Sequence, residues 1–141
     1  MSTATWSVMS YIAGAAILGT LGALHLVFTG FTQRFDPRDA TLVPAMQATS
    51  PRLTRDTSMW RCWIGFNASH SLGVLLFAAL YGLLATRHAE VLRASPMLAW
   101  LAPAGAAAYT VLAWRYWFRV PLTGAALATA CFCAGAALLG A

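Results

Sequence analysis

The sequence contains no lysine and has few charged side chains of any kind. Its nine basic residues are all arginine, they face only four acidic residues, and charged residues make up 9% of the chain. An ordinary soluble domain carries about 25% charged residues. A chain of 141 residues that is 60% hydrophobic could not bury that much apolar surface in water. The composition therefore predicts an integral membrane protein and excludes an ordinary soluble domain.

Cysteine is also scarce, and its placement excludes a disulfide framework. Cys62, Cys131 and Cys133 are odd in number and all lie inside apolar stretches. Cys131 and Cys133 would point about 200° from each other on a helix, so they are poorly placed to hold one metal ion together. We interpret all three as small apolar residues that fill space between helices.

Four apolar stretches are long enough to cross a bilayer core of about 30 Å as helices. They cover residues 6–32, 56–86, 96–118 and 121–140, and a polar loop covers 33–55. The sequence predicts an all-α fold, in which four transmembrane helices form an up-down bundle and a single membrane domain over residues 1–141. Asp36-Pro37 predicts a short amphipathic helix in the first loop, from Pro37 to about Gln47. Residues 87–95 are expected to form a polar turn, and Pro103 a kink in the third span.

The distribution of arginine predicts the orientation of the spans. The first and third loops and their flanks carry seven arginines, namely Arg34, Arg38, Arg52, Arg55, Arg61, Arg115 and Arg119. The opposite side carries only Arg87 and Arg93. The positive-inside rule then predicts cytoplasmic first and third loops and both termini outside. The net charge of +5 indicates anionic membrane lipids as partners, and not nucleic acid, because the charges flank apolar spans.

Residues 59–73, MWRCWIGFNASHSLG, hold most of the polar groups that apolar packing does not explain. At about 100° per residue, one face of this helix groups polar and aromatic side chains. These are Trp60, Trp63, Asn67, His70 and Ser71. The opposite face carries Gly65, Ser69 and Gly73. We expect this small-residue face to pack closely against another helix.

An ionisable residue inside a span is costly and by default marks a functional site. His25 and His70 are expected to differ in depth by about 8 to 10 Å, at a rise of about 1.5 Å per residue, and to line one cavity. Arg61, in the first turn of the second span, and Arg38 would hold an anionic group. The candidate ligand-binding residues are His25, Thr29, Arg38, Trp60, Arg61, Trp63, Asn67, His70 and Ser71. The alternative interpretation is that the polar side chains only join helices through hydrogen bonds.

Three motifs of the sequence resemble those of a known protein family. They are His25-Leu-Val-Phe-Thr29, Phe35-Asp-Pro-Arg-Asp39, and Met59-Trp-Arg-x-Trp-x-Gly-Phe-Asn-x-Ser-His-Ser-x-Gly73. Over about residues 20–85 the chain resembles a family of small uncharacterised bacterial four-span integral membrane proteins. The resemblance implies the four-span fold in a bacterial inner (cytoplasmic) membrane, and it implies no catalytic chemistry.

Three functions fit these features. The first is binding of an amphipathic or anionic small molecule, such as a lipid or isoprenoid, and the question of catalysis stays open. A histidine could act as a general base, but no span contains the carboxylate that a Ser–His–Asp arrangement needs. The second is a transporter that works as a homo-oligomer, or an accessory subunit of a larger membrane complex. The third is a haem or metal protein with His25 and His70 as ligands.

Overall fold

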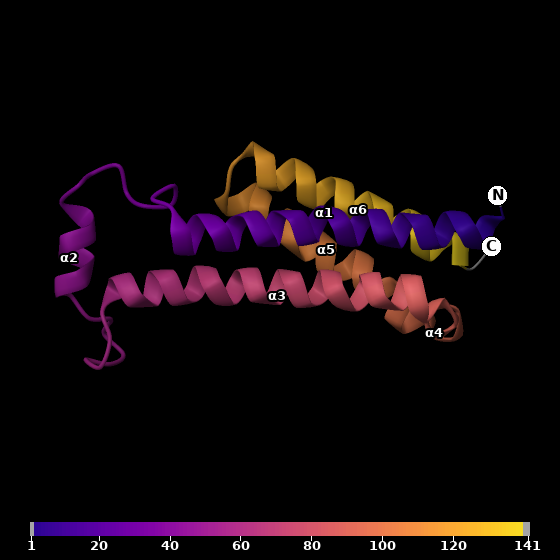
Figure 1. The fold of residues 1–141 in the computed structure, drawn as a ribbon, viewed down its shortest axis with the longest axis horizontal. Helices are drawn as coiled ribbons and strands as arrows, with labels where there is room; N and C mark the ends of the chain where they lie inside the picture. The colour runs from indigo at the N-terminus through magenta and orange to yellow at the C-terminus, as the bar shows by residue number, and fades with distance from the viewer. Residues whose placement is uncertain (1, 140–141) are drawn as a thin grey trace. The chain divides into compact units, whose positions relative to one another are not determined.

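The structure is a computed structural model that describes residues 2–139. In that range the chain is helical, without strands (Figure 1). Its helices are α1 (Thr3–Phe31), α2 (Leu42–Ala48), α3 (Met59–Arg87), α4 (Ala89–Ala94), α5 (Pro96–Tyr116) and α6 (Arg119–Leu139). Four of them, α1, α3, α5 and α6, are long and apolar enough to cross a membrane. The predicted all-α fold with four spans is confirmed.

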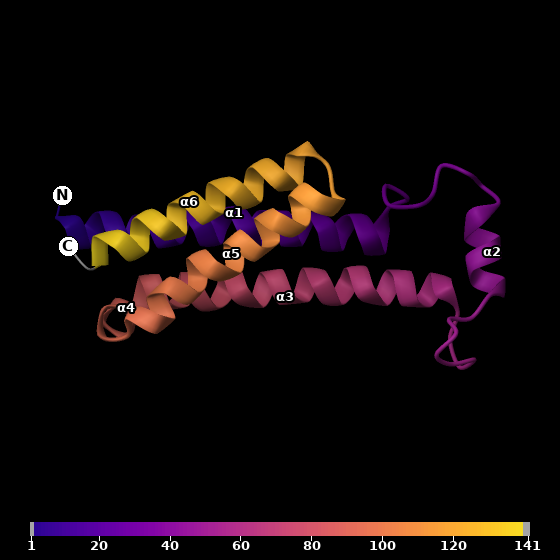
Figure 2. The same cartoon turned by 180° about the vertical axis from the view of Figure 1, so that it is seen from behind.

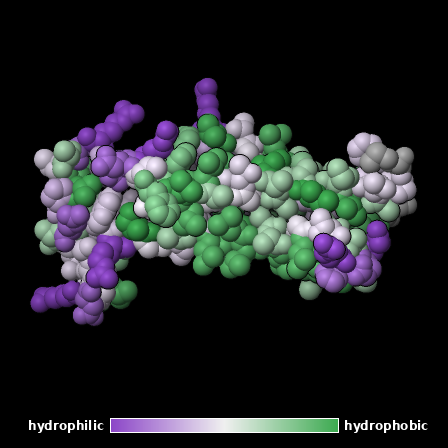
Figure 3. Space-filling model, viewed as in Figure 1, coloured by the Kyte–Doolittle hydropathy of each residue, from purple (hydrophilic) through white to green (hydrophobic). Residues whose placement is uncertain are grey.

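Contacts divide the chain into two compact units. Unit 1 comprises Met1–Leu21 and Val74–Ala141, and unit 2 comprises Gly22–Gly73. Helices α1 and α3 each contribute residues to both units, whereas α5 and α6 belong to unit 1 and α2 to unit 2. In Figure 3, hydrophobic residues cover much of the visible face of the unit 1 helices, and hydrophilic side chains gather around the α2 loop of unit 2. The single domain expected from the sequence stays a prediction.

Four aromatic rings form the centre of unit 1. Tyr11 of α1, Phe77 and Tyr81 of α3, and Phe132 of α6 lie with ring centroids between 4.9 and 6.3 Å apart. Tyr11, Tyr81 and Phe132 are almost completely buried, and most of the other buried side chains are alanine. Because alanine is small, the helix backbones can approach one another closely around the rings.

Pro103 lies buried inside α5 and explains where the Tyr11 hydroxyl points. A proline has no N–H, so the carbonyl four residues earlier, at Ala99, loses its normal helical donor. The Tyr11 hydroxyl donates to the Ala99 carbonyl oxygen at 2.8 Å, and the Tyr81 hydroxyl donates to the Leu98 carbonyl oxygen at 3.1 Å. Side chains from α1 and α3 thus satisfy backbone groups of α5 in a region without water.

These contacts establish the alternating direction of the four helices. Tyr11 near the start of α1 reaches the start of α5, and Tyr81 near the end of α3 reaches the same turn. The Ser7 hydroxyl donates to the carbonyl of Gly135, near the end of α6, at 2.8 Å. Figures 1 and 2 both show α5 and α6 as an antiparallel pair joined by a short turn. The up-down order predicted from the sequence is confirmed for unit 1.

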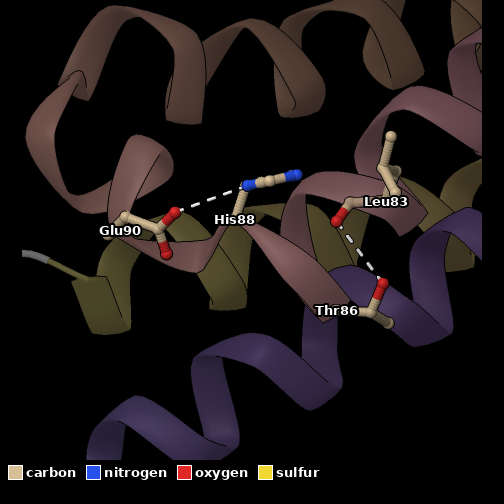
Figure 4. A network of polar contacts seen from close by, with 4 residues as sticks. All are labelled: Leu83, Thr86, His88 and Glu90. Atoms are coloured by element: carbon tan, nitrogen blue, oxygen red, sulfur yellow. Dashed lines mark hydrogen bonds and ion pairs between the residues drawn. The ribbon is translucent and has the colours of Figure 1, made fainter.

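The junction between α3 and α5 contains a short helix that the sequence analysis missed. Residues 87–95 were expected to form only a turn, but Ala89–Ala94 form α4. Its first turn carries Glu90 and its last turn Arg93, which suits the helix dipole. Figure 4 shows His88 directed toward Glu90, and Thr86 toward the Leu83 carbonyl. His88 Nδ1 lies 3.5 Å from Glu90 Oε1, and the Thr86 hydroxyl donates to the Leu83 carbonyl.

The short helix of the first loop begins later than predicted. It starts at Leu42 and not at Pro37, because Asp39 Oδ1 accepts hydrogen bonds from the backbone N–H and the hydroxyl of Thr41 and holds a turn there. The start of α5 follows the expected rule, since Ser95 Oγ accepts from the Leu98 N–H directly before Pro96.

The predicted packing face of Gly65, Ser69 and Gly73 is wrong for the chain as the structure describes it. All three residues are exposed, and a Cβ added at Gly65 would meet no atom within 4 Å. The tight glycine contacts lie elsewhere, within unit 1. A Cβ at Gly135 would lie 2.7 Å from the Tyr11 ring, and one at Gly14 would lie 3.0 Å from the Phe132 ring. The periodicity separated the two faces of α3 correctly but did not show which one meets protein.

We predict that Tyr11→Phe lowers the free energy of unfolding in detergent by about 1–2 kcal/mol, because the Ala99 carbonyl loses its donor. In a Pro103→Ala background the backbone N–H of residue 103 is restored and can donate to the Ala99 carbonyl. Tyr11→Phe should then lower the free energy of unfolding clearly less. Equilibrium unfolding of the four proteins forms a double-mutant cycle. Tyr116→Phe, at a residue that is 73% exposed, serves as the control and should be nearly neutral. Equal costs of Tyr11→Phe in both backgrounds would refute the link to Pro103.

We also predict opposite effects of alanine at two glycines. Gly135→Ala should destabilise the protein by about 1–3 kcal/mol, because the new methyl group overlaps the Tyr11 ring. Gly65→Ala should be neutral or stabilising by up to about 1 kcal/mol, because alanine favours a helix and the site is open. Thermal melting in one detergent measures both. A loss of stability at Gly65 would show that its face packs against a second molecule.

Candidate functional site

The polar residues of unit 2 meet where α1 and α3 face each other, and Asn67 is the centre of their hydrogen bonding. Asn67 Nδ2 donates to the Trp63 carbonyl at 2.8 Å, which turns its Oδ1 toward α1. His25 Nε2 lies 3.0 Å from that oxygen. Because a carbonyl oxygen only accepts, His25 must carry a proton on Nε2 in this arrangement. Asn67 therefore joins the two helices and selects the tautomer of His25.

His70 lies against His25. The two ring centroids are 5.3 Å apart and the rings are nearly perpendicular, at 67°. The depth difference of about 8 to 10 Å expected from helix rise is wrong for the side chains, because the two rings extend toward each other and make contact. Both histidines are only half-buried, so a polar group can approach them.

Thr29 and Ser71 bond to their own helices. The Thr29 hydroxyl donates to the His25 carbonyl at 2.8 Å, and the Ser71 hydroxyl donates to the Asn67 carbonyl at 2.9 Å. Both side chains are buried. Their hydroxyl hydrogens are thus engaged one turn back along the helix, as is common for serine and threonine in helices. They support the backbone that carries His25 and Asn67.

The aromatic residue Phe35 is part of the cluster, although the sequence analysis did not single it out as a site residue. Its ring centroid lies 4.6 Å from that of His25 and 6.1 Å from that of Phe28. The Arg34 guanidinium lies 5.0 Å above the Phe28 ring, a cation–π contact. The turn after α1, closed by the Asp36 N–H on the Gln33 carbonyl, folds Phe35 back onto the helix. Helical periodicity could not reveal this contact, because Phe35 lies outside the helix.

Arg38, Arg61, Trp60 and Trp63 contribute no side chain to the hydrogen bonds described above. Arg38 and Arg61 are exposed. Trp60 is half-buried, and Trp63 is 40% exposed and contributes its backbone carbonyl to Asn67. The structure therefore brings together His25, Asn67, His70, Thr29 and Ser71, and leaves the two arginines at the surface of the same unit.

The geometry does not favour the metal interpretation. Within residues 2–139 no group of three or more His, Cys, Asp or Glu side chains is placed to hold a metal ion. A bis-histidine haem needs an iron atom and a porphyrin between its two rings. The rings of His25 and His70 are instead in direct contact, and His25 Nε2 faces Asn67. Haem binding would require both side chains to separate.

We predict an energetic coupling between His25 and Asn67. In a double-mutant cycle of His25→Ala and Asn67→Ala, equilibrium unfolding should give a coupling energy of about 0.5–1.5 kcal/mol, the range for hydrogen bonds between membrane helices. Thr110 and Thr129, whose hydroxyls lie 3.0 Å apart between α5 and α6, provide a reference pair for the method. Additive effects at His25 and Asn67 would contradict the bond.

Comparison of the chain with family models, curated proteins and solved structures finds no match. The resemblance to a bacterial four-span family therefore stays a prediction, and function is argued from the geometry of the chain alone. The four helices that can cross a membrane make it a multi-pass membrane protein.

Proposed function

We propose that this protein binds an amphipathic small molecule with an anionic head, such as a lipid or isoprenoid, through the polar cluster of unit 2. The observation that carries the proposal is the half-buried pair of His25 and His70, whose rings are in contact. His25 is hydrogen-bonded to Asn67 on α3, and the first turn of α3 carries an exposed arginine, Arg61. One hydrogen bond would be enough to join α1 and α3. The His70 ring, half-buried and in contact with the His25 ring, offers a polar group a further point of contact inside a membrane-spanning helix.

The arginines of unit 2 supply the charge for an anionic head. Arg34, Arg38, Arg52, Arg55 and Arg61 outnumber the three aspartates of the same unit. Within residues 2–139 no arginine lies within ion-pair distance of a carboxylate. Two of the aspartates are held by neighbouring threonines, Asp39 by Thr41 and Asp56 by Thr54. The guanidinium groups are therefore available for a phosphate or carboxylate, which they can bind in a bidentate manner.

The hydrogen bonds to Asp39 also affect its charge. The side-chain and backbone hydrogen bonds from Thr41 lower the pKa of the Asp39 carboxyl below its ordinary value. An aspartate is ionised at neutral pH with or without this shift, so the exposed Asp39 carboxylate repels an anionic ligand head. This favours binding on the side of Arg61 and the histidines.

The proposed setting is a bacterial inner membrane. The excess of arginine in the first and third loops supports a cytoplasmic position for these loops and an outer position for both termini. Membrane lipids are the proposed partners, and a homo-oligomer or a larger membrane complex is the proposed assembly if the exposed face of α3 is covered by protein.

The test is mass spectrometry of the small molecules that co-purify with the protein in a mild detergent. We expect Arg61→Ala and His70→Ala each to lower the amount of the bound species about tenfold or more, because hydrogen bonds to charged groups contribute about 1.5–3 kcal/mol. Melting curves of each variant separate loss of ligand from loss of fold.

Two control variants remove a histidine and an arginine that lie outside unit 2. His88→Ala and Arg93→Ala act at exposed residues around α4, and should retain the bound species of the parent protein. The same species in the same amount from all five proteins would eliminate the binding site and leave the hydrogen bonds as helix contacts only.

A further inference from the structure

The segment between α2 and α3, residues 49–58, forms a closed loop, called here the α2–α3 loop. The N–H of Met59, the first residue of α3, donates to the Thr49 carbonyl at 2.8 Å and ties the two ends of the loop together. Inside the loop the Thr54 N–H donates to the Pro51 carbonyl at 3.3 Å and closes a turn. The residues of that turn are thereby held in one compact projection.

The turn presents a leucine to its surroundings. Leu53 is 95% exposed, more than Phe31 at the end of α1, which is 84% exposed. A single exposed leucine is common on protein surfaces and carries no argument by itself. Its position differs from that of an ordinary surface leucine, because the loop ends at the first residue of a membrane-spanning helix. The bilayer is therefore the surface closest to the loop.

Charge on both sides of Leu53 indicates which surface the loop fits. Arg52 and Arg55 are exposed, and neither lies within ion-pair distance of a carboxylate of residues 2–139. The nearby Asp56 carboxylate accepts a hydrogen bond from the Thr54 hydroxyl at 2.8 Å, so it is directed back into the loop. An apolar tip between two free guanidinium groups is complementary to a layer of anionic phosphates above acyl chains.

We infer that the α2–α3 loop docks onto anionic phospholipid headgroups of the bilayer that the protein spans. Leu53 inserts below the level of the phosphates, and Arg52 and Arg55 bind the phosphates on either side. Helix α2, which has no buried residues and exposes Leu42, adds apolar surface directly before the loop. This docking site is separate from the histidine cluster and does not depend on the ligand proposed there.

The experiment places an environment-sensitive NBD probe on a cysteine at residue 53 of the full chain, with Cys62, Cys131 and Cys133 replaced by alanine. The protein is reconstituted into vesicles of phosphatidylcholine alone or of equal amounts of phosphatidylcholine and phosphatidylglycerol. We expect blue-shifted emission and quenching by headgroup nitroxides in the anionic vesicles only, both reversed by high salt. Replacing Arg52 and Arg55 by glutamine should weaken partition of the loop about 30-fold, since each arginine near an anionic surface contributes about fivefold.

The matched control replaces Arg87 and Arg93 by glutamine, which removes the same charge from the far end of α3 and from α4. This control should keep the emission and quenching of the labelled parent. Equal emission in neutral and anionic vesicles would overturn the inference, as would equal losses in the two double variants. A blue shift without headgroup quenching would also overturn it, because residue 53 would then be covered by protein. None of the substituted residues belongs to the buried core, so melting should confirm that each variant is folded.

Discussion

The hydrogen bond from the Tyr11 hydroxyl to the Ala99 carbonyl follows from a strict constraint on backbone groups inside a membrane. Without water, a carbonyl that loses its helical donor must find another one in the protein. Pro103 removes that donor in the middle of α5, and the replacement comes from α1. The position of Tyr11 then determines its surroundings: Phe132 and Tyr81 pack against its ring, and Gly135 leaves room for it. The centre of unit 1 is thus organised around one missing N–H.

The same constraint applies in unit 2, where the polar groups that need a hydrogen-bond partner belong to side chains and not to the backbone. Asn67 satisfies both ends of its amide, one on the Trp63 carbonyl of its own helix and one on His25 of α1. Thr29 and Ser71 satisfy their hydroxyl hydrogens locally. The hydrogen bond between His25 and Asn67 is enough by itself to connect α1 and α3. The second histidine and the Phe35 ring both pack against His25, so the cluster extends beyond that one hydrogen bond.

Several elements could be predicted because their causes are local. The third span was predicted to begin at Pro96, where α5 does begin, and the Ser95 hydroxyl oxygen accepts the Leu98 N–H there. The short helix at Leu42 was predicted in the right loop but started too early, since Asp39 prefers to bond Thr41 and forms a turn. The grouping of Asn67 with His70 and Ser71 on one face of α3 followed from periodicity. The contact of Phe35 with His25 did not, because a loop residue has no helical periodicity.

The sequence by itself determined the number of spans, their alternating direction and the residues that share a helix face. Length, apolar composition and the angle per residue are properties of each segment alone. Only the tertiary structure decided which face meets protein. In water the apolar face must turn inward, but in a bilayer both faces of a helix can be apolar, so hydrophobicity does not distinguish them. For that reason the face of Gly65 was misplaced, while contacts such as Tyr11 with Ala99, 88 residues apart, and His25 with Asn67, 42 residues apart, came from the fold alone.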